Sequence, residues 1–358
     1  MGYRKLNFGS GSQAGLSLVE LMIALVLGLL LSTGVVTIFI SAKQDYQVQD
    51  AISQVQENGR FSLDFLAYDI RMAGFSGCSN EMPTANTVKN APPSLTRFSQ
   101  GIEGYDGDNE TLPSSMFPNA KPGTDAIVVH VADMSSEVTV VKQPSGNAAA
   151  LHVSSGHGFE PGAILMVVEA NCSNRAIFVM TNTQGGGNSG NSGNSGNSGN
   201  DKSTITHNTG KTYTYGIYTG VGNCTKAIKG NFTCDDTSGS SNTAYSPGSS
   251  VFSVKSIGFY IREDGASNVP TLYKVDISNP NISPQPLVEG VSDLDVLYGV
   301  YDESADTLEF KDADVITAAN EWGKVTTVQL EVVADSLTQV DGAPVTRRYV
   351  RTVKMRNR

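Results

Sequence analysis

The sequence has little of what most enzyme active sites need. Only four histidines occur in 358 residues, none of them paired at the i, i+4 spacing of a helical zinc site, and HExxH is missing. There is also no GxSxG turn, no GxxxxGK[ST] phosphate loop and no GxGxxG after a strand. We therefore predict no catalytic site, no metal and no cofactor, and expect the histidines to be solvated or satisfied in the core. They are His130, His152, His157 and His207.

One acidic segment invites comparison with a calcium loop. In YDGDNET (105–111), Asp106, Asp108 and Glu110 alternate along the chain. An EF-hand loop needs further oxygen ligands and a glutamate at its twelfth position, where this sequence has Phe117. We interpret the segment as a solvated acidic loop.

Charge is sparse and unevenly placed. Charged residues make up 17% of the chain, the net charge is −10, and residues 347–358 are strongly basic. An acidic protein does not favour general nucleic-acid binding, because neutralising phosphates requires a basic face. The basic residues of this tail fit a terminal strand whose charges either discourage edge-to-edge aggregation or pair with acids on adjacent subunits. They are Arg347, Arg348, Arg351, Lys354, Arg356 and Arg358.

Cysteine is also scarce, and no C-x-x-C pair occurs. The four cysteines are spread through the part of the chain expected outside the membrane, which favours disulfides over free buried thiols. Cys224 and Cys234 are close enough to close a short loop, which leaves Cys78 with Cys172, although four cysteines permit three connectivities.

The N-terminal region has a single long hydrophobic run. Residues 16–40 could span a bilayer, since 25 helical residues exceed the roughly 30 Å hydrocarbon core. No A-x-A-like cleavage site follows the run, so we expect it to be retained rather than removed as a secretory signal. Glu20 lies inside it, where a carboxylate costs about 2.5–3.5 kcal/mol near the bilayer centre. Such a charge needs a counter-charge.

Cleavage between Gly15 and Leu16 would supply one, because the new α-amino group is positive and lies four residues from Glu20. GLSLVELMIAL resembles the type III signal of prepilins. The resemblance implies removal of the leader 1–15 by the prepilin peptidase and N-methylation of Leu16. It also implies that Glu20 registers each subunit against its neighbour. Leu16 replaces the usual phenylalanine, and the apolar run has no proline.

Three further passages resemble PilW-type minor pilins of type IV pili: DIRMAGFSGC (69–78), VEGVSDLDVLYGV (288–300) and VRTVKMRN (350–357). What the resemblance implies is a non-enzymatic subunit that primes pilus assembly and helps to carry a large adhesin at the tip, serving adhesion and twitching motility. Its partners would be the other minor pilins and the major pilin. Before assembly it would be a single-pass protein of the inner membrane with a periplasmic body.

The expected fold is α+β, with a long helix at 16–75 packed on a largely antiparallel sheet in a body at 76–358. Gly74 is the expected helix stop, Pro-rich irregular loops should follow Cys78, and the NSG repeat at 185–200 should be disordered. One apolar helix stripe should face the body: Val48, Ile52, Val55, Phe61, Phe65, Tyr68 and Met72. The predicted strands are 126–131, 138–141, 163–168, 176–180, 251–261, 271–277, 287–300, 325–333 and 345–355.

Three other functions fit parts of this pattern. A minor pseudopilin of type II secretion shares the signal and the helix. A signal-anchored periplasmic enzyme would need a catalytic constellation that the sequence does not display. A DNA-binding pilus subunit would have to use the basic tail.

Overall fold

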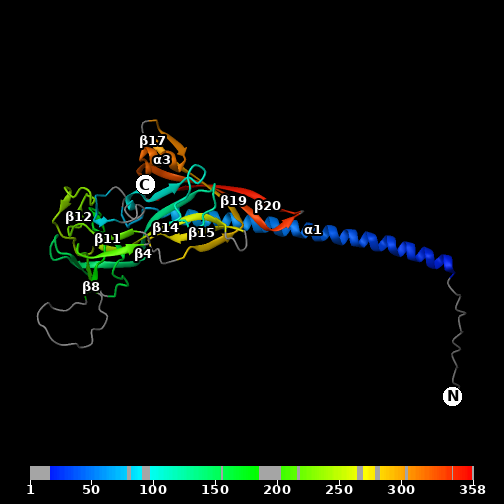
Figure 1. Cartoon of the computed structure of the whole chain (residues 1–358), viewed down its shortest axis with the longest axis horizontal. Helices are drawn as coiled ribbons and strands as arrows, with labels where there is room; N and C mark the ends of the chain where they lie inside the picture. The colour runs from blue at the N-terminus through cyan, green and yellow to red at the C-terminus, as the bar shows by residue number, and fades with distance from the viewer. Residues whose placement is uncertain are drawn as a thin grey trace, which may run out of the picture.

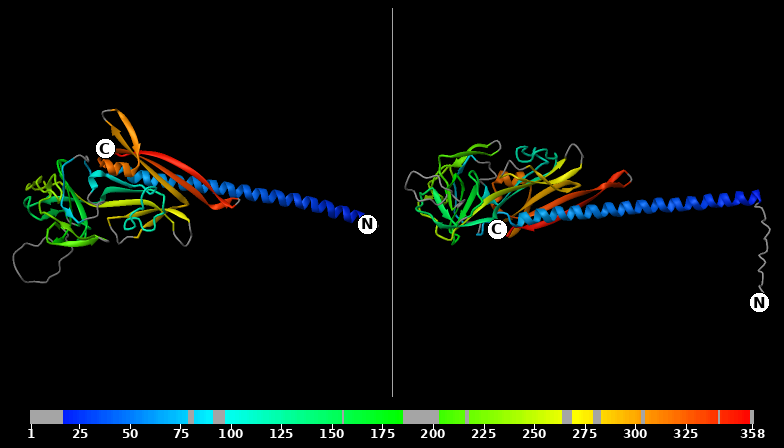
Figure 2. Two further views of the ribbon diagram at one scale, coloured as in Figure 1. Left: turned by 45° about the horizontal axis from the view of Figure 1, so that its top comes forward. Right: turned by 90° about the horizontal axis from the view of Figure 1, so that it is seen from below.

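The computed structural model describes residues 17–78, 82–90, 97–154, 156–184, 203–215, 218–263, 269–278, 283–302, 305–340 and 342–356. Its dominant element is helix α1 (Leu18–Arg71), whose 54 residues extend about 80 Å. A β-rich body packs against the C-terminal half of α1, while the N-terminal half projects away from it (Figures 1 and 2). The leader 1–15, Leu16 and the repeat 185–200 lie outside the described residues.

The ends of α1 have clear local causes. Ser17 is the N-cap, and its Oγ accepts a hydrogen bond from the Glu20 N–H at 3.2 Å. The helix ends at Arg71, three residues before the predicted stop at Gly74. Gly74 has a φ of +70° and its N–H donates to the His130 carbonyl at 2.8 Å, so it turns the chain into the body.

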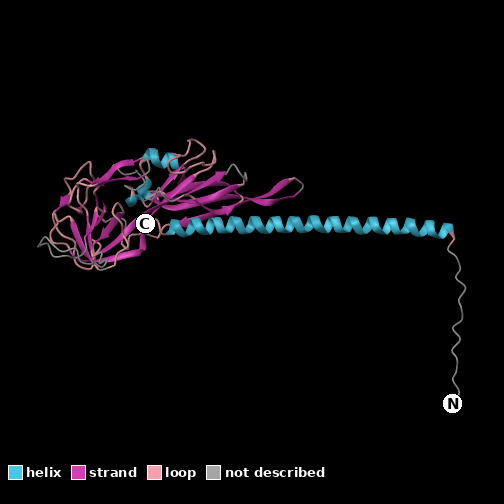
Figure 3. Cartoon of the chain, turned by 60° about the horizontal axis from the view of Figure 1, so that its bottom comes forward, coloured by secondary structure: helices cyan, strands magenta, loops and turns pink. Residues whose placement is uncertain are grey.

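A four-stranded antiparallel sheet packs along one side of α1. Its order is β18-β17-β19-β20, so β20 is an edge strand. Figure 3 shows the β19–β20 hairpin running beside the helix toward its projecting half. The strands are β17 (Val291–Asp302), β18 (Thr307–Lys311), β19 (Val325–Val340) and β20 (Ala343–Lys354). Helix α3 (Ala313–Ala319) and the 3-10 turn η2 (Trp322–Lys324) connect β18 to β19.

A second sheet of eleven strands contributes to the core at the buried face of α1 and continues into the far end of the body. Its long strands β4 (Ala126–Lys142) and β14 (Ser250–Glu263) pair with each other. On the helix side the sheet also contains β3 (Ile102–Tyr105), β15 (Pro270–Asp276) and β16 (Gln285–Glu289). Away from the helix it contains β1 (Thr84–Asn86), β5 (Ala150–Val153), β6 (Ile164–Val168), β7 (Arg175–Val179), β8 (Asn182–Gln184) and β9 (Thr204–Thr206).

Two small sheets complete the end of the body far from the N-terminus, where β8, β11 and β12 lie in Figure 1. All ladders between the described strands are antiparallel except β1–β7, which confirms the predicted α+β fold with a largely antiparallel sheet. One small sheet joins β2 (Val88–Lys89), β10 (Thr212–Tyr215) and β11 (Tyr218–Asn223), and the other joins β12 (Lys229–Gly230) and β13 (Ser240–Ser241).

The structure corrects three of the predicted strand assignments. The predicted strands 126–131 and 138–141 are one strand, β4, which remains paired with β14 across an irregularity in register. The predicted strand 287–300 is two strands of different sheets, because Gly290 has a φ of +74° and turns the chain from β16 into β17. The predicted irregular stretch after Cys78 contains β1, β2, β3 and the 3-10 turn η1 (Phe98–Gln100).

The main core lies where α1 meets both sheets. Leu66 and Ile70 are fully buried in it, with Phe259 from β14 and Leu330 from β19. Burial of several such side chains, each contributing about 1.5–3 kcal/mol, holds the helix to the body. The far end of the body has its own apolar clusters around Phe178 and other buried residues.

Candidate functional site

The projecting half of α1 is the first candidate functional surface. An apolar window of this helix is long enough to cross a membrane, and none of it is buried within the chain. Glu20 lies in the first helical turn, exposed like its neighbours. The two residues of the predicted cleavage and methylation site, Gly15 and Leu16, lie outside the described residues, so the structure does not place them relative to Glu20.

The second half of α1 has two different faces, so the single predicted stripe is wrong. Val55 is fully buried against the body, and Ile52 is partly buried. Phe61, Phe65 and Tyr68 point away from the body and are 49%, 47% and 70% exposed. At about 100° per residue, the six-residue step from Val55 to Phe61 turns most of the way from one face to the other. An aromatic stripe therefore remains uncovered on α1.

Two disulfides join the cysteines. Cys78, just beyond the exit of α1, is bonded to Cys172 in the turn between β6 and β7, and so ties the helix exit to the far end of the body. Cys224 is bonded to Cys234, closing a short loop after β11. Of the three connectivities that the sequence allowed, the structure has the one that pairs Cys78 with Cys172 and Cys224 with Cys234.

The four histidines have different surroundings. Nδ1 of buried His130 lies 2.9 Å from Ser256 Oγ, and burial together with nearby Arg97 lowers the pKa of His130 to about 3. Burial likewise lowers the pKa of His207 to about 4. His157 is buried and stacks on Phe159, whereas the exposed His152 has its Nδ1 3.1 Å from Thr204 Oγ1. Among the described residues, no three His, Cys, Asp or Glu side chains are placed to hold a metal ion.

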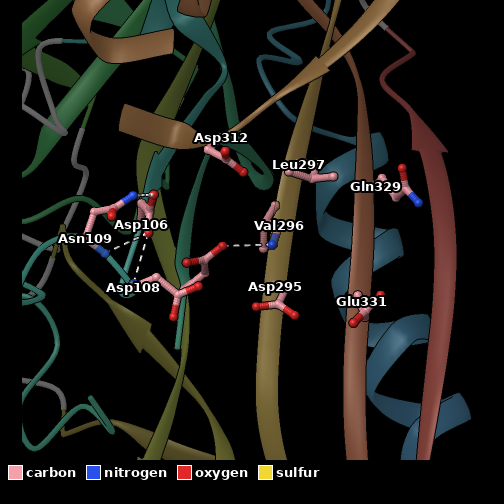
Figure 4. Close-up of a pocket in the computed structure, with 10 residues that line it drawn as sticks. Asp106, Asp108, Asn109, Asp295, Val296, Leu297, Asp312, Gln329 and Glu331 are labelled. Carbon is pink, nitrogen blue, oxygen red and sulfur yellow. Dashed lines mark hydrogen bonds between the residues drawn. The ribbon is translucent and has the colours of Figure 1, made fainter. Parts of the chain in front are cut away.

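The acidic loop lies at a cleft that the sequence did not predict. Asp106 and Asp108 line a cavity of about 330 Å³ with carboxylates from distant parts of the chain, as Figure 4 shows. Glu110, the third residue of the supposed calcium loop, does not line it, and Phe117 is buried in an apolar cluster. The distant carboxylates are Asp125, Asp295, Asp312 and Glu331.

Asp125 holds the two sheets together beside this cleft. Its Oδ1 accepts the Gly107 N–H and its Oδ2 accepts the Val296 N–H, both at 2.9 Å. Its own N–H donates to the Leu294 carbonyl at 2.9 Å. Burial raises the pKa of Asp125 to about 7, against the lowering effect of the two N–H groups. Burial and neighbouring acids, Asp293 first, raise the pKa of Asp295 to about 6.

The basic C-terminal residues up to Arg356 lie on and just after β20, and Arg358 lies outside the described residues. Arg351 is paired with Asp64 of α1, and Arg348 Nη1 lies 2.8 Å from Glu331 Oε1 of β19. The tail is therefore a sheet edge that contacts acids of its own chain, rather than a free basic arm.

Comparison with known families agrees with this arrangement at both ends of the chain. The prokaryotic N-terminal methylation motif matches residues 11–36, which include Gly15, Leu16 and Glu20. The family described as Type IV Pilus-assembly protein W, PilW, matches residues 258–357. The two matches support a type IV pilin of the PilW type. No curated protein and no solved structure matches the chain.

The PilW match corresponds to a definite part of the fold. It begins within β14 and includes β15 to β20, among which β16, β17, β19 and β20 contact α1. The motif match covers the projecting, membrane-compatible half of α1, in keeping with anchoring in the inner membrane and incorporation into a pilus. The far end of the body, with both small sheets and both disulfides, lies outside the two matches.

Proposed function

We propose that the protein is a minor pilin that enters the type IV pilus by its N-terminal helix. The prepilin peptidase cleaves between Gly15 and Leu16 and methylates Leu16. Glu20 then pairs with the new amino group of its own chain or of a neighbour. The function is binding and assembly rather than catalysis.

The observation that carries this proposal is the exposure of the whole apolar half of α1. None of the described residues of the body covers it, so we expect it to be covered by lipid or by other chains. Moving such a helix from lipid into a bundle of pilin helices exchanges one apolar environment for another, so packing and polar pairing decide the arrangement. Glu20 is the acidic group in that segment on which pairing can act.

The pilus contacts follow from this route. Other minor pilins and the major pilin pack against α1 after extraction from the inner membrane. The β-rich body then lies outward from the helix bundle, and at the filament tip it can help to support a large adhesin, with effects on adhesion and twitching motility. DNA binding is not part of the proposal, because Arg348 and Arg351 already pair with acids of the same chain.

The direct test is N-terminal sequencing of the protein from sheared, purified pili. We expect methylated Leu16 as the first residue, and no processing in a Gly15→Asp variant. An unprocessed start in the cell, or absence from fibres, contradicts the proposal. Loss of protein secretion without loss of twitching in a deletion strain would instead assign the protein to a type II secretion filament.

The role of Glu20 has its own test. Glu20→Ala should lower the amount of this subunit in sheared pili while leaving the body folded, because the lost pairing lies between chains. Asp45→Ala is the matched control, since it removes an exposed acid from the same helix outside the apolar run. Equal incorporation of both variants refutes the pairing role.

A further inference from the structure

We propose that the open edge of β20 binds an extended, acidic strand from a different protein chain. The starting observation is that, among the strands that the structure describes, β20 pairs only with β19. Twelve residues of β20 therefore present one side to solvent. A long, regular edge strand is a template for pairing with another strand unless something covers it.

The alternation of hydrogen bonds along β20 shows which of its backbone groups are available to another strand. Met355 lies opposite Thr326 in the ladder and donates to its carbonyl at 3.0 Å, so alternate residues before Met355 bond to β19. The residues between them direct their N–H and C=O groups to the open side. Arg356 follows the same alternation, because its N–H points away from β19 and donates to the Arg71 carbonyl at 3.3 Å. The outward residues are Arg348, Val350, Thr352 and Lys354.

An incoming strand would also meet the aromatic stripe of α1. Asp64, which pairs with Arg351 of β20, lies on the same helix face as Phe61 and Tyr68, at spacings of three and four residues. Both aromatic side chains are about half exposed or more. Alternate side chains of a strand added at β20 point toward α1, so apolar residues at those positions can cover this stripe.

Charge selects the partner. The segment Ala343–Arg356 contains five basic residues and no acid. Arg347, Lys354 and Arg356 have no carboxylate partner among the residues that the structure describes. Pairing two copies of β20 would bring like charges together, which destabilises a sheet, whereas a strand with acids at alternating positions gains favourable cross-strand pairs. The edge therefore disfavours a second copy and favours an acidic strand from another chain.

The inference rests on the proposed function only for where the partner is found, which is among pilus components in the membrane or the fibre. A photo-crosslinking amino acid at Val350, which is 51% exposed, probes the edge in cells that make the full chain. The matched control is the same probe at Leu308 of β18, an apolar residue 44% exposed on the opposite edge strand of the sheet. We expect an adduct from Val350 alone, mapped by mass spectrometry to an acidic, extended segment of another pilus protein.

Two sets of changes test how the edge binds. Val350→Pro removes an outward N–H without removing a β19–β20 hydrogen bond, and proline is tolerated at such edge positions. Because position 350 is then proline, the probe is placed at Thr352. We expect Val350→Pro to reduce the adduct about tenfold or more, because strand-pairing hydrogen bonds are lost. The double change Arg347→Glu and Lys354→Glu should reduce it similarly while leaving the backbone unchanged, and it decides the matter if Val350→Pro fails to fold.

The outcomes separate this inference from the proposed function. No adduct, equal adducts from Val350 and Leu308, or an adduct with a second copy of this chain overturns the edge proposal. Leader processing is read on the same samples by N-terminal sequencing. A processed N-terminus without a Val350 adduct contradicts only the edge, and an unprocessed N-terminus with the adduct contradicts only the pilin function.

Discussion

Truncating Leu66 to alanine is the sharpest test of how α1 is seated. Leu66 is 0% exposed and belongs to the core shared by α1 and both sheets, whereas its neighbour Phe65 faces away from the body. Replacing Leu66 by alanine leaves the helix propensity nearly unaltered, and replacing Phe65 by alanine slightly improves it. The two variants therefore differ mainly in what the side chain packs against.

The expected magnitudes are well separated. Leu66→Ala removes buried methyl groups and leaves a cavity, at a cost of about 2–5 kcal/mol in the free energy of unfolding. Phe65→Ala removes a half-exposed ring and should cost about 1 kcal/mol or less. For a body of this size, each kcal/mol lowers the melting temperature by about 2–4 °C, so Leu66→Ala should lower it by roughly 5–15 °C.

The assay is thermal unfolding of the full chain in detergent, followed by circular dichroism at wavelengths that report the β-rich body. Denaturant unfolding of the same samples gives the free energies. If Phe65→Ala costs as much as Leu66→Ala, the outward face of α1 is assigned to the wrong side and the uncovered aromatic stripe does not exist.

Three further predictions concern the body. Gly59→Ala should destabilise it, because the new Cβ would lie 2.3 Å from the Tyr349 ring, and Tyr349→Leu should restore part of the loss. Because the pKa of Asp125 is raised to about 7, folding favours its neutral form, and stability should fall as pH rises from 4 to 7. The loss should be about 2 kcal/mol, half the full linkage value because solvent partly screens the site, and urea unfolding of Asp125→Asn should show a flatter pH profile. Removing the Cys78–Cys172 disulfide, which closes a separation of 94 residues, should cost up to about 4 kcal/mol in denaturant unfolding, and no loss would show that this bond does not constrain the unfolded chain.

Several features could be read from the sequence because their causes are local. A long, largely apolar run predicts a membrane-compatible helix, and apolar residues at helical spacing among polar ones predict its continuation to near Gly74. Apolar runs rich in β-branched residues predicted the centres of β14, β15 and β19. The ends and breaks of strands were harder to predict, because the turn at Gly290 divides a segment in which apolar residues continue on both sides of the glycine.

The residues of the candidate surfaces were likewise predictable only where their signal is local in the sequence. Gly15, Leu16 and Glu20 were found because their signal is a short contiguous motif. The cleft beside Asp125 was missed, because its carboxylates are separated by up to about two hundred residues in the chain and meet only through the topology of two sheets. The open edge of β20 was missed in part, since a basic terminal strand was predicted but its free side was not.

By itself, the sequence determined that the chain has a long N-terminal helix with an acid in its apolar half, four cysteines able to form disulfides, and a β-rich body. Only the tertiary structure decided that Val55 faces the body while Phe61 and Tyr68 do not. Both kinds of residue are apolar, and helical spacing alone cannot say which of two faces a sheet will cover. That choice depends on which strands the rest of the chain brings to the helix, and it leaves an aromatic face beside an unpaired strand edge.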